Sequence, residues 1–234
     1  MRSQGNKVIW TSQPLNPSTP QPLNLSTHQP INPSTHQPLN PPINQQNMIL
    51  PVVAVGHPNL RKVAVEITAE YPGLQQLITD MWETMYFSSG VGLAAPQINK
   101  TIRLFVVDAS PYEKENPQIK DFKKVFINPK IVEEKGEEWA FSEGCLSIPD
   151  IHEDVTRKPD VRITYYDEQF NFRDEWFSDI LARIIQHEYD HLEGILFVDK
   201  IHPLRKIMVK RKIQEISKGI TEAKYKMIFP PRKR

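Results

Sequence analysis

Apolar residues recur at helical spacing in the chain. Between residues 73 and 87 they fall at positions 74, 77, 78, 81, 82, 85 and 86, the period of an amphipathic helix. An apolar run at 180–185 predicts a buried helix over 180–194, with Ser178 or Asp179 as its N-cap. A further helix, rich in Lys and Arg, is expected from 203 to about 216.

Short runs of β-branched and aromatic residues predict strands between these helices. They cover residues 101–108, 125–127, 131–132, 139–141, 161–166 and 170–177. Gly136 and Asp167–Glu168 mark turns, residues 49–53 form an extended lead-in, and partial alternation over 223–229 predicts a terminal strand. Because turns rather than helices connect most of the strands, we expect antiparallel sheet, followed by the helix over 180–194.

Composition changes sharply at about residue 47. From Gln13 an eight-residue unit recurs as QPLNPSTP, QPLNLSTH, QPINPSTH and QPLNPPIN, without acidic residues. Such a segment cannot bury enough apolar surface to offset its ordering entropy, so residues 1–47 are predicted to be a disordered tail before a single domain at 48–234. The repeats could be a docking tail or spacer. We favour translated upstream sequence, with Met48 as the biological start.

Charge and cysteine content indicate a protein of a reducing compartment. The formal net charge is +1, and the one cysteine cannot form an internal disulfide, so we expect a cytoplasmic protein. No apolar run approaches the length of a membrane span, and no signal-type hydrophobic region begins the chain. Residues 200–234 contain twelve basic and two acidic residues, which indicates either a solvated face or an anionic partner.

The helix over 180–194 contains a histidine pair with metal-binding spacing. His187 and His191 lie four residues apart, so they project from one helix face, with Glu188 beside them. One histidine alone would be explained by a solvated helix face, or by a core position where its hydrogen bonds are satisfied. Two buried imidazoles with a carboxylate between them are costly unless an ion compensates, so the H-E-x-x-H pattern predicts a metal site.

The identity of the third metal ligand separates the enzyme classes that share this pattern. A metzincin would have histidine where Phe197 stands, so that class is excluded. A thermolysin-like enzyme would use a downstream glutamate, and Glu215 is a candidate, although its basic surroundings favour a solvated acid. The remaining candidate is Cys145, in the segment EGCLS.

Three motifs stand in one order along the chain: GVGLAAPQ at 90–97, EGCLS at 143–147 and QHEYDHLEG at 186–194. In this order and spacing the chain resembles the peptide deformylase family over about residues 48–212. That family removes the N-formyl group from the initiator methionine of new bacterial proteins. The resemblance implies an α+β fold, with antiparallel β-sheets packed around a central helix that carries the HExxH motif, plus a C-terminal helix.

The resemblance also implies a role for each matching residue. Cys145, His187 and His191 would be the metal ligands, and Glu188 the general acid/base. Two donors would stabilise the oxyanion, the Gln97 amide and the backbone N–H of Leu146. The implied metal is Fe(II), with Ni, Co or Zn able to occupy the site.

The expected substrate is the N-formyl-methionine end of a nascent peptide. Ile180 and Ile184 precede His187 on the same helix face and could line a pocket for the methionine side chain. Residues near Val91, Gly92 and Leu93 would pair with the substrate backbone. The basic helix near the C-terminus could dock on the ribosome, as in some members of the family. We expect no membrane partner and no specific DNA.

The chain departs from the family pattern in two places. His152 stands where the sequences that this chain resembles often carry arginine, and the repeat tract has no counterpart.

One alternative function is a zinc peptidase that cleaves internal bonds, which would tolerate loss of Cys145. The other is a metal-stabilised, ribosome-associated binding protein, which would leave Glu188 and Gln97 unexplained.

Overall fold

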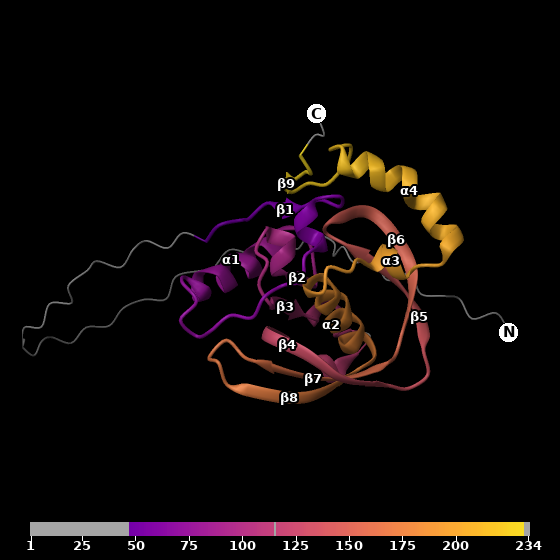
Figure 1. Ribbon diagram of the computed structural model, residues 1–234. Coiled ribbons are helices and arrows are strands. Elements are labelled where there is room, and N and C mark those ends of the chain that lie inside the picture. The colour runs from indigo at the N-terminus through magenta and orange to yellow at the C-terminus, as the bar shows by residue number, and fades with distance from the viewer. Residues whose placement is uncertain (1–46, 115, 232–234) are drawn as a thin grey trace, which may run out of the picture. The chain divides into compact units, whose positions relative to one another are not determined.

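The computed structural model describes residues 47–114 and 116–231 (Figure 1). The repeat tract, and with it the prediction of a disordered tail, lies outside these residues. Within them, no helix is long and apolar enough to cross a membrane.

A five-stranded antiparallel sheet forms one side of the fold. Its strand order is β2-β3-β4-β7-β8. The strands are β2 (Gly92–Ala94), β3 (Leu104–Asp108), β4 (Lys123–Lys135), β7 (Asp160–Tyr166) and β8 (Phe172–Ser178). The two strands expected at 125–127 and 131–132 are one continuous strand, β4, which register shifts divide internally.

A long hairpin forms the second sheet. It joins β5 (Trp139–Cys145) to β6 (Ile148–Arg157) through a two-residue turn at Leu146 and Ser147. No strand was predicted at 148–157. Along β6 buried and exposed residues alternate, but two of the buried positions hold the charged residues Glu153 and Arg157, so the apolar alternation is interrupted.

Helices and short 3-10 turns complete the described fold. The α-helices are α1 (Leu74–Phe87), α2 (Asp179–Leu192), α3 (Phe197–Lys200) and α4 (Pro203–Ser217). The 3-10 turns are η1 (Pro58–Arg61), η2 (Ala95–Ile98), η3 (Ser110–Tyr112) and η4 (Pro117–Ile119). The expected terminal strand is shorter than predicted: β9 (Met227–Ile228) pairs in parallel with β1 (Val52–Val53).

Helix α2 lies centrally, between the five-stranded sheet and the β5–β6 hairpin (Figure 1). Its apolar residues, among them Ile180, Ile184 and Ile185, join the core cluster beneath the sheet. Burying one such side chain stabilises the fold by roughly 1.5–3 kcal/mol. This packing holds the motif helix rigidly, and the α+β architecture around it confirms the predicted fold class.

Candidate metal centre

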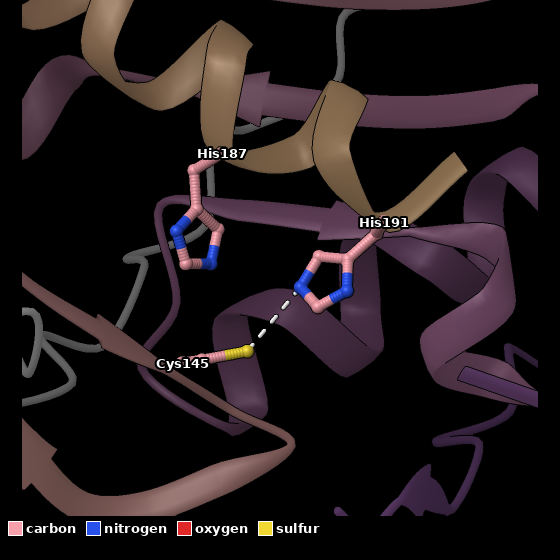
Figure 2. A group of neighbouring side chains, drawn as sticks. All are labelled: Cys145, His187 and His191. Carbon is pink, nitrogen blue, oxygen red and sulfur yellow. Dashed lines mark hydrogen bonds between the residues drawn. The ribbon is translucent and has the colours of Figure 1, made fainter. Parts of the chain in front are cut away.

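Three metal-ligating side chains converge where α2 meets the end of β5. One ligand atom each from Cys145, His187 and His191 lies within 4.8 Å of the others. The Cys145 Sγ atom is 3.3 Å from His191 Nε2, and both imidazoles project from α2 toward the sulfur (Figure 2). Glu215, the alternative third ligand, instead forms an ion pair with Arg211 on α4.

A buried carboxylate orients the first histidine. The Nδ1 atom of His187 is 2.9 Å from Glu143 Oε2, so its Nε2 is the nitrogen available to a metal. Glu143 is fully buried and accepts two hydrogen bonds from Arg157 and one from Arg183. Burial alone would raise the pKa of Glu143, but hydrogen bonds and charge from Arg157 and His187 outweigh it and hold that pKa well below its usual range.

The donor set fits a bound divalent ion. Two imidazoles and a thiolate are ligands that iron, nickel, cobalt and zinc accept in proteins. Burial lowers the pKa of His191 well below its ordinary value, which favours the neutral ring that metal binding requires. Glu188 is the next residue after His187, and its buried Oε2 has no hydrogen-bond partner among the described residues.

Glu188 lies at the contact between α2 and β2. Burial raises its pKa to about 7. A Cβ atom on Gly92 of β2 would lie 2.7 Å from the Glu188 carboxyl carbon, so any side chain there would displace the carboxylate. The absence of a side chain at Gly92 therefore leaves the space that the Glu188 carboxylate occupies.

Gln97 and Leu146 lie next to Cys145. The Gln97 Oε1 atom accepts the Ala94 N–H at 2.8 Å, and its Nε2 lies 3.4 Å from both Cys145 Sγ and Ser147 Oγ. Leu146 is the next residue after Cys145, in the turn of the β5–β6 hairpin. The fold thus brings together residues from all three sequence motifs.

Comparison with known proteins agrees with this geometry. The family model for polypeptide deformylase matches residues 49–207. The chain belongs to the peptide deformylase family. As a metal-dependent amide hydrolase of this family, the enzyme removes the N-formyl group from the N-terminal methionine of new proteins and releases formate. The internal-bond peptidase and the non-enzymatic alternative are therefore set aside.

Relatives and solved structures resemble most of the chain. A peptide deformylase from Flavobacterium psychrophilum is 53% identical over 194 residues, which cover 80% of this chain and 100% of that protein. One from Christiangramia forsetii is 52% identical over 194 residues, covering 80% and 99%. A crystal structure of a peptide deformylase from Legionella pneumophila has a TM-score of 0.65 and 37% identity, covering 74% of this chain and 97% of that one.

The residues expected to bind substrate lie on the two elements that flank the centre. Val91, Gly92 and Leu93 are buried at β2, which is an edge strand of the five-stranded sheet among the described strands. Ile180 and Ile184 are almost fully buried in the core cluster. His152, where relatives were expected to have arginine, is on β6, and burial lowers its pKa.

The sequence reasoning missed the ion network behind the histidines. Arg157 connects Glu143 to Asp190 of α2, and Arg183 donates to Glu143 and to the Val155 carbonyl. Glu143 and Asp190 lie inside two of the three sequence motifs, so their positions were a signal that they matter to the site. No motif contains Arg157, and its partners come from other elements, so nothing in the sequence pointed to it.

Proposed function

We propose that Cys145, His187 and His191 hold one divalent ion and that Glu188, Gln97 and Leu146 act on the formyl group around it. The observation that carries this assignment is the convergence of the three ligand atoms within 4.8 Å, next to a buried carboxylate. When bound, the ion supplies Lewis acidity, which polarises the formyl carbonyl and makes water more acidic.

Glu188 is the proton carrier in this scheme. Its pKa of about 7, raised by burial, lets the carboxylate accept a proton from the attacking water at neutral pH and then release it. The proton passes to the nitrogen of the leaving methionine, and the C–N bond breaks to give formate and a free amine. The contact with Gly92 restricts the positions that the carboxylate can adopt.

Gln97 and Leu146 are the proposed hydrogen-bond donors to the oxyanion. Because Gln97 Oε1 is bound to the Ala94 N–H, the amide cannot flip, and its Nε2 stays directed toward the Cys145 turn. A backbone N–H from Leu146 adds a second donor. Removing one such donor typically costs about 3 kcal/mol of transition-state stabilisation.

Fe(II) is the metal that we propose for the native enzyme, with Zn, Ni or Co as replacements. A thiolate with two imidazoles accepts all four ions, so the assignment to iron comes from the family resemblance.

The substrate is proposed to bind as an added strand along β2. Its edge position leaves backbone groups near Val91 and Leu93 for an extended peptide. Ile180 and Ile184 form the apolar wall that receives the methionine side chain. Because the substrates are nascent chains, we place the reaction in the cytoplasm.

Helix α4 is the proposed ribosome-docking element. Two of its basic residues bind β6: Arg205 forms an ion pair with Glu153, and Lys212 donates a hydrogen bond to the Asp150 carbonyl. Leu204, Ile207 and Met208 are exposed on the helix. Of the neighbouring basic residues, Lys206 donates to the Asp199 carbonyl and Arg211 pairs with Glu215. Lysine and arginine contacts to phosphate would give binding that weakens steeply with salt.

Charge reversal tests this docking. Changing Lys206, Lys210 and Arg211 to glutamate should abolish co-sedimentation with ribosomes at low salt, while turnover of a free formyl-Met tripeptide stays unchanged. Unaltered co-sedimentation would refute docking, and loss of tripeptide turnover would assign the helix a structural role. The matched control reverses three exposed lysines elsewhere, Lys100, Lys114 and Lys120.

The experiment for the catalytic assignment compares Glu188→Gln with Glu215→Gln after anaerobic purification. Glu188→Gln should retain the metal and lose nearly all formate release from a formyl-Met peptide, since it removes only proton transfer. Glu215→Gln should match the parent in metal content and rate. A Glu188→Gln rate within about tenfold of the parent would remove Glu188 from the mechanism, because a positioned acid/base contributes at least 10²-fold.

A further inference from the structure

The chain after α4 returns to the hairpin that carries Cys145. β9 pairs in parallel with β1: the Val52 N–H donates to the Lys226 carbonyl at 2.9 Å, and the Ala54 N–H to the Ile228 carbonyl at 2.8 Å. Figure 1 shows β1 and β9 side by side. This segment lies beyond residue 207, where the family match ends.

Tyr225, just before β9, contacts the turn itself. Its hydroxyl donates to the Leu146 carbonyl oxygen at 2.8 Å. Burial raises the pKa of Tyr225, so the hydroxyl remains a protonated donor at neutral pH. The next carbonyl, that of Ser147, accepts the Val55 N–H at 2.9 Å. The N-terminal lead-in and the C-terminal segment thus bind consecutive carbonyls of the turn.

The same elements share one apolar cluster with the turn. Ile216 of α4 lies in the cluster with Ile148, and Cys145 and Ile228 pack against it. The packing keeps the C-terminal segment against the hairpin and so supports the hydrogen bond of Tyr225.

Contacts from outside the hairpin matter for this turn because the hydrogen-bond ladder between β5 and β6 is irregular next to it. Cys145 pairs with Ile148, but the register shifts between Glu143 and Cys145. Leu146 and Ser147 are the two residues of the turn, and the register shift interrupts the regular ladder immediately before it. The bond to the Leu146 carbonyl holds the Leu146–Ser147 peptide plane. The Leu146 N–H lies in the preceding plane, and the two backbone torsions of Leu146 link it to the plane that Tyr225 holds.

We propose that Tyr225 is a positioning residue that holds the turn so that the Leu146 N–H points at the formyl oxygen. This inference rests on the proposed role of Leu146 as an oxyanion donor. Tyr225 does not touch the substrate. It acts through the backbone of Leu146, from a part of the chain outside the three catalytic motifs.

Tyr225→Phe tests the proposal, because it removes only the hydroxyl. The kcat on a formyl-Met tripeptide should fall about tenfold with KM nearly unchanged, since the donor is displaced rather than deleted. In the metal-free protein, the backbone amides of residues 146–148 should exchange hydrogen faster than in the parent. Tm should fall only by the few °C that loss of about one hydrogen bond costs, and subsequent metal uptake should stay the same. The control is Tyr166→Phe, whose ring belongs to an aromatic cluster with Phe170 and Phe172.

Two results would overturn the role of Tyr225. The first is a Tyr225→Phe kcat equal to that of Tyr166→Phe. The second is unchanged exchange at residues 146–148. Faster exchange at residues 146–148 with an unchanged kcat would place the failure in the proposed donor role of Leu146, whereas unchanged exchange would place it in Tyr225, so the two failures are distinguishable.

Discussion

Loss of Arg157 should destabilise this enzyme strongly, because it leaves a buried charge behind. Its Nε and Nη2 atoms donate to the two Glu143 oxygens at 2.7 and 2.9 Å, and its Nη1 donates to Asp190 at 2.7 Å. The side chains of Arg157 and Glu143 are 2% and 0% exposed. Arg157→Met keeps the length and removes the charge, which leaves the buried Glu143 carboxylate with Arg183 and His187 alone.

The size of the effect follows from this burial. Breaking a buried ion pair by removing one partner costs about 3–5 kcal/mol, because the other charge stays buried. For a folded part of this length, each kcal/mol lowers Tm by about 2–4 °C, so the expected loss is about 6–20 °C. The surface pair of Arg162 with Asp174 provides the comparison, since its side chains are 40% and 35% exposed and such pairs contribute about 0–1 kcal/mol.

The assay is thermal unfolding of Arg157→Met and Arg162→Met, both metal-free, followed by metal titration. Removing the metal separates folding from ion binding. Loss of the support behind His187 should also weaken metal affinity about 10–100-fold, whereas Arg162→Met should bind as the parent does. Equal Tm values for the two variants would refute the argument that the buried network stabilises the fold.

Three further changes have defined outcomes. Cys145→Ser should lower the metal that survives dialysis, measured by elemental analysis, and normal metal content with normal rate would mean that another residue is the third ligand. Gly92→Ala should reduce formate release by at least about tenfold, because its Cβ occupies the space of the Glu188 carboxylate, and a parental rate would contradict that steric argument. A protein that begins at Met48 should match the full chain in Tm and turnover if residues 1–47 are dispensable, and a lower Tm would show that the repeats pack on the domain.

The sequence predicted those parts of the site that depend on local geometry. His187 and His191 share a face of α2 because a step of four residues is close to one helical turn of about 3.6 residues. The helix begins at Asp179 with Ser178 at the N-cap position, as expected. However, the Ser178 hydroxyl donates to Asp160 instead of capping the helix.

The local sequence pattern does not predict contacts between segments that are far apart in the chain. The buried charges of β6, Glu153 and Arg157, concealed a strand, because their partners lie on α4, β5 and α2. Tyr225 stands in no motif, and only the fold places its hydroxyl on Leu146, 79 residues earlier in the chain. A single sequence carries little information about such pairings.

The parallel pairing of β1 with β9 has a consequence for the enzyme's own synthesis. The ribosome makes Tyr225, Met227 and Ile228 after every metal ligand and every strand of the five-stranded sheet. A growing chain can therefore pair β1 with β9 only after residue 228 has left the exit tunnel. A product of premature termination just before Met227 would retain all three metal ligands and yet lack β9.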